Sequence, residues 1–436
     1  MTGTLSSMAL AVRRLTAEVC IAGGGPAGMM LGLLLARAGV DVVVLEKHAD
    51  FFRDFRGDTV HPSTLDLIDQ LGLREQFEAI PHTRLRKLDM VVNGLRLHAI
   101  DFGLLNRPNA ELALMPQWDL LDLLATEAKK HPSFTLVMNA EVTGVTHRGN
   151  RIGGVRARTP DGVLRIDAAM TIAADGRDST VRRALRIPVK QHGVPIDVLW
   201  FRLDRPAATL PDTLGWISRE AMVVTIPRPD YLQCGLLIPK GTFPALRDAG
   251  LPAFRALVAS ATPRLTRVLE RVTDWDDIKL LSVQIDRLVR WSVPGALCIG
   301  DAAHAMSPAF GVGINYAIQD AVATANALVP LLRSGADATA LDAGARAVEH
   351  RRARPTEWMQ RIQIALHRTI AKGGADLLHA PPTLRERILL ANLMPVIKPL
   401  AVRLVGYGFR PERIDADVLD PASSADSPRP TPGTPA

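Results

Sequence analysis

A glycine-rich turn at residues 23–28 is the first segment whose residue types and spacing could do chemistry. It reads Gly-Gly-Gly-Pro-Ala-Gly and lies between a short apolar run at 18–22 and a helical pattern over 27–38. Glycines permit a tight turn and let a pyrophosphate approach the backbone, while the helix N-terminus presents free N–H groups to the phosphates. Glu46 ends the next apolar run 18 positions beyond Gly28, close to the spacing of about 20 expected for an acid that binds a ribose. These features predict a dinucleotide-binding βαβ unit, although a purely structural glycine turn shares the pattern and neither NAD nor FAD is singled out.

Two later segments place polar residues at the ends of apolar runs. Residues 174–182 read Ala-Asp-Gly-Arg-Asp-Ser-Thr-Val-Arg, and residues 300–304 read Gly-Asp-Ala-Ala-His. Asp301 at a strand end can accept hydrogen bonds from cofactor hydroxyls, because ligands bind at the carboxyl edge of a parallel sheet. The run at 311–315 opens a helix, so its N–H groups and dipole can stabilise negative charge on a bound ring.

With these three ordered motifs, the sequence closely resembles the class A flavoprotein monooxygenases, the p-hydroxybenzoate hydroxylase-like aromatic hydroxylases, over residues 17–330. The resemblance implies FAD, with Asp301 at the ribityl hydroxyls and the loop before residue 315 nearest the isoalloxazine. It also implies NADPH or NADH as a transient co-substrate, which agrees with the single glycine turn of this kind. Many members read Gly-Gln-Gly in the loop where this chain reads Gly-Val-Gly, so the backbone role survives and the glutamine side chain is absent.

Further cofactor contacts follow from the same resemblance. Arg56 stands where the family has an arginine beside the pyrophosphate, and a guanidinium fits phosphate oxygens in a bidentate manner. Gln117 precedes a helix and matches a residue that reaches ribose or ribityl oxygens. The segment from Asp175 to Arg182 matches one that the family uses for FAD and the nicotinamide cofactor. The alternative is that Asp175 only caps the next turn and that Arg182 forms a surface ion pair. The predicted cofactor-binding set is Gly23, Gly25, Pro26, Ala27, Gly28, Glu46, Lys47, Arg56, Gln117, Val142, Asp175, Gly176, Asp301, Gly313, Ile314 and Asn315.

No side chain is expected to act as a covalent catalyst, since the flavin supplies the chemistry. The residues predicted nearest the reaction are Pro308, Gly311 and Gly313, with Tyr231 and Arg202 as secondary candidates. Core packing explains Trp200 and Trp216 as well as substrate contact does. His304 is expected to order its loop, and no group of His, Cys, Asp and Glu has metal-ligand spacing, so no metal is predicted.

The elements that position these residues predict an α/β protein. It has a Rossmann-like FAD-binding domain, an inserted antiparallel β-sheet substrate domain and a helical C-terminal region. Alternating residues around Asn93-Gly94 predict a hairpin with a type I′ turn, and the helix at 252–272 is expected to break at Pro263. The predicted boundaries are 15–80, 114–183 and 291–332 for the FAD-binding domain, 81–113 and 184–290 for the substrate domain, 333–415 for the helical region and 416–436 for a disordered tail.

Composition agrees with a soluble globular protein of two or three folding units. The 436 residues are 47% hydrophobic and 22% charged, and the net charge of +7 is scattered with no recognised nucleic-acid module. The cysteines Cys20, Cys234 and Cys298 lie in apolar runs, which indicates buried hydrophobes in a reducing compartment. Arg13 and Arg14 follow the mildly apolar start instead of preceding it, which is the wrong order for a secretory signal, so we expect a cytoplasmic protein. No apolar stretch is long enough to span a bilayer, and we expect neither a membrane nor a nucleic-acid partner.

We therefore expect an FAD-dependent monooxygenase that uses NAD(P)H and O2 to hydroxylate an aromatic or polyketide-like small molecule. The resemblance implies that the oxygen passes through a flavin C4a-hydroperoxide. A related FAD-dependent reductase, epoxidase or oxidase is the alternative, and a non-catalytic flavin-binding module is a second one. The substrate, the choice between NADPH and NADH, the oligomeric state and the role of the C-terminal helices stay open at this point.

Overall fold

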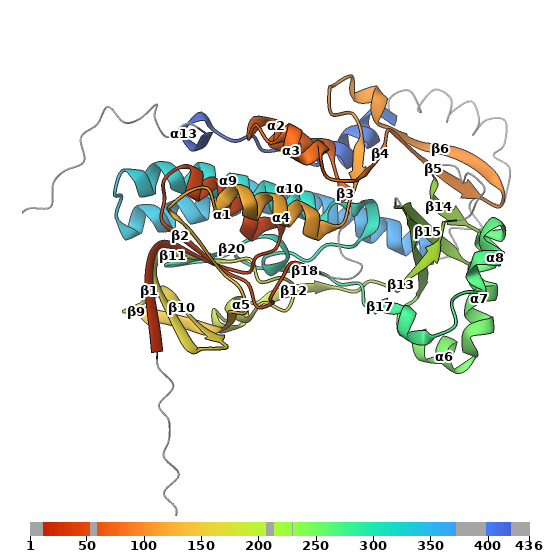
Figure 1. The fold of residues 1–436 in the computed structure, drawn as a ribbon, viewed down its shortest axis with the longest axis horizontal. Coiled ribbons are helices and arrows are strands. Elements are labelled where there is room, and N and C mark those ends of the chain that lie inside the picture. The colour runs from red at the N-terminus through yellow and green to blue at the C-terminus, as the bar shows by residue number, and fades with distance from the viewer. Residues whose placement is uncertain (1–11, 53–58, 206–212, 229, 372–397, 420–436) are drawn as a thin grey trace, which may run out of the picture.

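A mostly parallel sheet forms the layer that carries the glycine turn (Figure 1). The computed structural model describes residues 12–52, 59–205, 213–228, 230–371 and 398–419. The strand order is β19-β20-β11-β1-β2-β8, and β19 is the antiparallel edge strand. These strands are β1 (Val12–Ala22), β2 (Val42–Leu45), β8 (Phe134–Val137), β11 (Gly162–Ala173), β19 (Ser292–Val293) and β20 (Ala296–Cys298).

Helices cover one face of this sheet, and a β-hairpin lies across the other (Figure 1). The helix α1 (Pro26–Arg37) begins with a proline, whose fixed φ suits a first helical position, and it packs against α4 and α9. The remaining elements of this layer are α4 (Gln117–Ala128), α9 (Gly313–Arg333), α10 (Ala338–Ala371), β9 (Glu141–Arg148), β10 (Arg151–Thr159) and α5 (Thr180–Ala184). The βαβ unit predicted from the glycine turn is confirmed.

A second sheet of seven strands lies beyond the carboxyl ends of the first, in the order β17-β13-β16-β15-β14-β5-β6. Its pairs are antiparallel except β14 with β5, which are parallel. At this pair the early hairpin joins the strands of the later insertion. The strands are β5 (Lys87–Val92), β6 (Leu95–Asp101), β13 (Ile196–Asp204), β14 (Thr213–Ile217), β15 (Met222–Pro227), β16 (Tyr231–Pro239) and β17 (Lys279–Leu281).

The turn of the early hairpin has the conformation that its sequence predicts. Asn93 and Gly94 have φ of 47° and 85°, as a type I′ turn requires. Helices α6 (Phe243–Asp248), α7 (Gly250–Ala261) and α8 (Thr266–Leu269) follow the second sheet, and Phe254 on α7 packs against Phe201 on β13. The helical stretch breaks at Pro263, as predicted, because α7 ends at Ala261 and a 3-10 turn follows.

Smaller elements complete the molecule. A three-stranded sheet joins β3 (Thr59–Val60), β7 (Leu112–Leu114) and β4 (Thr83–Leu85), a pair joins β12 (Val189–His192) with β18 (Ile285–Leu288), and two helices are α2 (Pro62–Gln70) and α3 (Arg74–Glu78). After α10 the chain is helical again over 398–407. The prediction that the tail begins at residue 416 is wrong, since α13 (Ala416–Leu419) packs on α1 and α9 and buries Val418.

The three cysteines are free and buried, as expected. Burial raises the pKa of the Cys20 thiol to about 12, so it is an apolar core group and not a nucleophile. Within the described ranges, no helix combines the length and apolar character needed to cross a membrane. The other predicted domain boundaries stay a prediction.

Candidate active site

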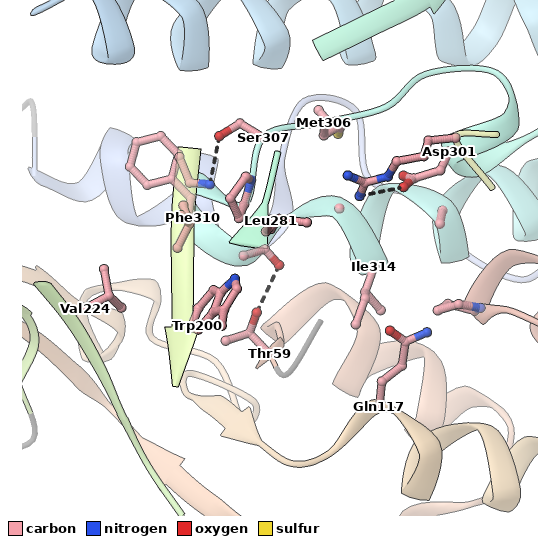
Figure 2. A pocket seen from close by; sticks show the side chains of 18 of the residues that line it. Thr59, Gln117, Trp200, Val224, Leu281, Asp301, Met306, Ser307, Phe310 and Ile314 are labelled. Atoms are coloured by element: carbon pink, nitrogen blue, oxygen red, sulfur yellow. Dashed lines mark hydrogen bonds and ion pairs between the residues drawn. The ribbon is translucent and has the colours of Figure 1, made fainter. Parts of the chain in front are cut away.

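A single cavity of about 1850 Å³ connects the carboxyl edge of the first sheet to the inner face of the second. Figure 2 shows side chains from both sides of it: Gln117, Asp301 and Ile314 from the first layer, and Trp200 and Val224 from the second sheet. The cavity is lined by Gly23, Gly25, Pro26, Ala27, Glu46, Lys47, Gln117, Val142, Asp175, Gly176, Asp301, Pro308, Gly311, Gly313 and Ile314. Most of the predicted site residues therefore meet in one space.

The glycines of the turn divide into two kinds. A Cβ on Gly28 would lie 1.9 Å from the carbonyl oxygen of Gly23, and a Cβ on Gly23 would lie 2.4 Å from that of Ala174. These two glycines let the helix and two strands approach closely. Gly25, the N-cap of α1, has a φ of −75°, and no atom lies within 4 Å of a Cβ built on it. Because Gly25 lines the cavity, the space before the helix N-terminus is an open cradle that fits a pyrophosphate.

Glu46 is buried behind this cradle. Its Oε2 accepts a hydrogen bond from the Gly24 N–H at 3.0 Å, and its Oε1 accepts one from the His48 N–H at 3.1 Å. The carboxylate thus holds the glycine turn while still lining the cavity. A carboxylate can accept several hydrogen bonds at once, so these two backbone contacts are compatible with a ribose hydroxyl as a further partner.

Asp175 has the capping role that the structural alternative describes. Its side chain accepts hydrogen bonds from the Ser179 hydroxyl, from the Thr180 N–H at 2.8 Å and from the Val181 N–H at 3.2 Å. Burial raises the pKa of Asp175 against the effect of these donors. Arg182 is paired with Asp286 at 3.3 Å, in an ion pair that is largely buried, not on the surface as the alternative supposed.

Asp301 is the most available carboxylate among the residues at the strand ends. Its side chain is 34% exposed, and its contact in the described chain is one ion pair of 3.4 Å with Arg177, drawn in Figure 2. Both residues line the cavity. An acceptor held this loosely fits the hydroxyl groups of a ribityl chain.

The loop before α9 is held from behind. Gly311 has a φ of 64°, and its carbonyl oxygen accepts a hydrogen bond of 3.0 Å from the Thr59 hydroxyl, shown in Figure 2. Phe310 also has a positive φ of 66°, a conformation that is unfavourable for a residue with a side chain. The loop keeps this geometry because other elements fix it, and it presents Phe310 to the cavity.

Two residues of α10 fix the start of this loop. Gln363 accepts a hydrogen bond from the Ser307 N–H at 3.2 Å and donates to the Ser307 carbonyl oxygen at 3.1 Å. His367 lies 2.5 Å from the Ser307 hydroxyl through its Nε2, and burial lowers its pKa. The sequence analysis missed both residues.

His61 packs behind the same loop. Its Nδ1 lies 2.7 Å from the carbonyl oxygen of Val405, and burial lowers its pKa to about 4. The neutral ring therefore donates to that carbonyl. Asn315 also lies behind the loop, because its Oδ1 accepts hydrogen bonds from the His61 N–H at 3.1 Å and the Thr64 hydroxyl at 2.6 Å.

A buried ion network anchors the Gly300 segment. Asp320 accepts hydrogen bonds from the Gly300 N–H at 3.0 Å and from the Arg352 guanidinium at 2.9 Å, and it lies 2.6 Å from His304. Burial opposes ionisation of Asp320, yet His304 and Arg352 together lower its pKa. Arg352 also donates to Glu412 at 3.2 Å. His304 therefore orders the loop, as expected, whereas Arg352 and Glu412 were not foreseen.

The structure does not bring every predicted residue to the cavity. Gly28 and Asn315 are packed behind its wall, and Arg56 falls outside the described residues. Tyr231 and Arg202 do not line the cavity. The Arg202 guanidinium instead lies over the Tyr231 ring, 4.8 Å from its centroid. Trp200 does line the cavity, whereas Trp216 is buried and donates to Thr225.

The part of the cavity beyond the loop is walled mainly by apolar side chains. They come from the second sheet and from α10, namely Met90, Trp200, Val224, Ile226, Leu237, Leu281, Met359, Ile362 and Leu366. Such a wall excludes water and suits a flat hydrophobic molecule.

Comparisons with known proteins agree with this geometry. Residues 16–361 match the family model described as "FAD binding domain". The chain is 30% identical over 411 residues to a 6-methylpretetramide 4-monooxygenase of Streptomyces rimosus, covering 94% of this chain and 96% of that protein. It is 28% identical to a protoasukamycin 4-monooxygenase of Streptomyces nodosus subsp. asukaensis, over 74% and 81% of the two chains.

Solved structures share the fold. PqsL of Pseudomonas aeruginosa superimposes with a TM-score of 0.71 at 24% identity, covering 83% of this chain and 98% of that one. The anhydrotetracycline hydroxylase OxyS of Streptomyces rimosus has a TM-score of 0.68 at 23% identity, covering 90% and 76%. The chain belongs to the FAD binding domain family and is one of the class A flavoprotein monooxygenases, with FAD as its cofactor.

Proposed function

We propose that this monooxygenase uses NAD(P)H and O2 to hydroxylate a multi-ring aromatic molecule of the polyketide kind. The observation that carries the proposal is that one cavity is lined both by the glycine turn and by the apolar side chains of the second sheet. One molecule of FAD and one flat substrate can thus lie side by side in this cavity. The 30% identity to a relative named for 6-methylpretetramide, over nearly the whole of both chains, supports a polycyclic substrate.

In this proposal the residues of the first layer hold FAD. The Gly25 cradle and the N-terminus of α1 bind the pyrophosphate, Glu46 accepts from the ribose, and Asp301 and Gln117 accept from the ribityl chain. The backbone N–H groups at Gly313, at the start of α9, would contact the isoalloxazine. When bound, FAD takes reducing equivalents from NAD(P)H and activates O2.

The remaining work of the protein is to orient the substrate and keep water away. Trp200, Val224 and Leu281 on the second sheet, with Phe310 on the loop before α9, form an apolar space lined by aromatic rings. Excluding water protects reactive intermediates from hydrolysis and strengthens the electrostatic contacts inside. The dependence on NAD(P)H and the three buried free thiols favour the cytoplasm as the place of action.

The test is a turnover assay on the purified, FAD-loaded protein. NAD(P)H oxidation should be stimulated by hydroxylated polycyclic aromatics, and a product one oxygen atom heavier should appear in the mass spectrum. A single-ring phenol serves as the size control and should stimulate less. A protein that binds FAD but transfers oxygen to none of these compounds would contradict the proposal.

A further inference from the structure

Two residues with hydrogen-bond donors, Trp200 and Gln233, line the part of the cavity where the substrate is proposed to bind. Trp200 on β13 pairs with Gly235 on β16, and Arg202 pairs with Gln233. Trp200 and Gln233 are therefore diagonal neighbours on the same face of the sheet, and both line the cavity. The Trp200 ring packs closely over Gly235, where a Cβ would lie only 3.1 Å from it.

Neither donor is satisfied within the described chain. The Nε1 of Trp200 and the Nε2 of Gln233 are buried and have no hydrogen-bond partner there. Gln233 is only 3% exposed. A buried donor without a partner costs about 1–3 kcal/mol, so such atoms call for an explanation. Trp216, on a neighbouring strand, shows the usual solution, since its Nε1 donates to the Thr225 hydroxyl at 2.9 Å.

The orientation of the Gln233 amide follows from its neighbour. The Nη2 of Arg228 donates to the Gln233 Oε1 at 3.1 Å, and Arg228 is 1% exposed. A guanidinium offers donors only, so the amide must turn its oxygen towards Arg228 and is left with its NH2 group for another partner. The buried positive charge also polarises the amide, which strengthens that NH2 as a donor.

We propose that the Trp200 indole N–H and the Gln233 amide N–H bind oxygen acceptors on the ring system of the substrate. The acceptors are carbonyl oxygens, because both groups of the protein are donors and a carbonyl oxygen can only accept. This inference rests on the proposed function and narrows it to oxygenated polycyclic aromatics. The pair fixes which ring faces the Phe310 loop, and it makes Trp200 and Gln233 residues that determine specificity.

The test measures binding without turnover. FAD-loaded protein is titrated, in the absence of NAD(P)H, with 2-hydroxyanthraquinone and with 2-hydroxyanthracene, which share a ring skeleton and a hydroxyl group and differ by two carbonyl oxygens. Binding is followed through the visible spectrum and fluorescence of the flavin. Trp200→Phe and Gln233→Leu each remove one donor and keep much of the side-chain volume. Trp216→Phe is the matched control, because its indole N–H faces Thr225 and not the cavity.

The wild-type protein should bind 2-hydroxyanthraquinone more tightly than 2-hydroxyanthracene. Each donor variant should weaken quinone binding about three- to ten-fold, the worth of one neutral hydrogen bond, and leave the carbonyl-free probe unchanged. FAD content and thermal midpoint confirm that a variant is folded. If Gln233→Leu does not fold, Trp200→Phe still tests the inference, because it keeps an aromatic ring in place. Equal affinity of wild type for the two probes, or variants that weaken both probes alike, would overturn the inference. The proposed function is tested separately by turnover. A protein that prefers the quinone but transfers no oxygen to any substrate would refute only the proposed function.

Discussion

Gly25 allows the cofactor cradle to be blocked without disturbing the fold. Its φ of −75° is compatible with any residue, and a Cβ built on it meets no atom within 4 Å. Gly25→Val therefore directs its methyl groups into the cavity where the pyrophosphate is proposed to bind. The protein itself should accept the substitution.

The magnitude follows from the hydrogen bonds that would be lost. Each bond from a backbone N–H to a charged phosphate oxygen is worth about 1.5–3 kcal/mol. Displacing the pyrophosphate from one or two N–H groups should cost about 3 kcal/mol, which corresponds to a Kd for FAD raised about 100-fold. The free energy of unfolding without FAD should change by less than about 1 kcal/mol, because a glycine is replaced at a compatible conformation.

The assay combines flavin fluorescence titration with urea unfolding of the FAD-free protein. Gly193→Val is the matched control, since Gly193 also has open space around its Cβ but does not line the cavity. Gly28→Ala is the opposite case, because its Cβ would lie 1.9 Å from the Gly23 carbonyl oxygen and should destabilise the FAD-free protein itself. If Gly25→Val bound FAD with the affinity of wild type, the pyrophosphate would not lie at this turn.

Three further predictions concern the supports of the site. Burial lowers the pKa of His61 to about 4 from 6.5 in the unfolded chain, so the unfolded state binds more protons between these values and the free energy of unfolding should fall by up to about 3 kcal/mol as pH drops through that window. His61→Asn, whose side-chain amide can still donate to the Val405 carbonyl, should flatten this slope in urea titrations, and an unchanged slope would show that another group is responsible. Asp320→Asn removes one of the two carboxylates that pair with the buried Arg352 guanidinium, and it also removes the negative charge beside His304. It should cost about 3 kcal/mol, and a thermal midpoint near that of wild type would contradict the network. Phe310→Gly removes a side chain held at a φ of 66° and should relieve about 1 kcal/mol of strain, so calorimetry should show a thermal midpoint equal to or above that of wild type, and a clear fall would mean that Phe310 packing outweighs its strain.

Local sequence rules predicted the elements that carry the cofactor motifs. The glycine turn, the hairpin turn at Asn93-Gly94 and the break at Pro263 each depend on the conformational limits of glycine, asparagine or proline, which act within a few residues. The strand β1 is longer than its apolar run indicates, since its exposed first half is held by pairing with β11. Pairing of that kind depends on a partner far along the chain.

Local sequence rules could not predict the residues that hold the flavin-facing loop in place. Arg352, Gln363 and His367 contact segments that lie far away in the sequence. They are buried polar residues on one stripe of α10, completed by Thr356 and Gln360. Polar residues recurring at helical spacing could have indicated a buried polar face, but only the fold shows what that face contacts.

The most direct test of the central claim uses 18O2. FAD-loaded protein is supplied with NAD(P)H, a polycyclic aromatic that stimulates NAD(P)H oxidation, and labelled oxygen in unlabelled water. We expect a product that carries one 18O atom, formed with consumption of one NAD(P)H. A product without label, or NAD(P)H consumption that yields only hydrogen peroxide with every compound tried, would contradict oxygen transfer as the function of this cavity.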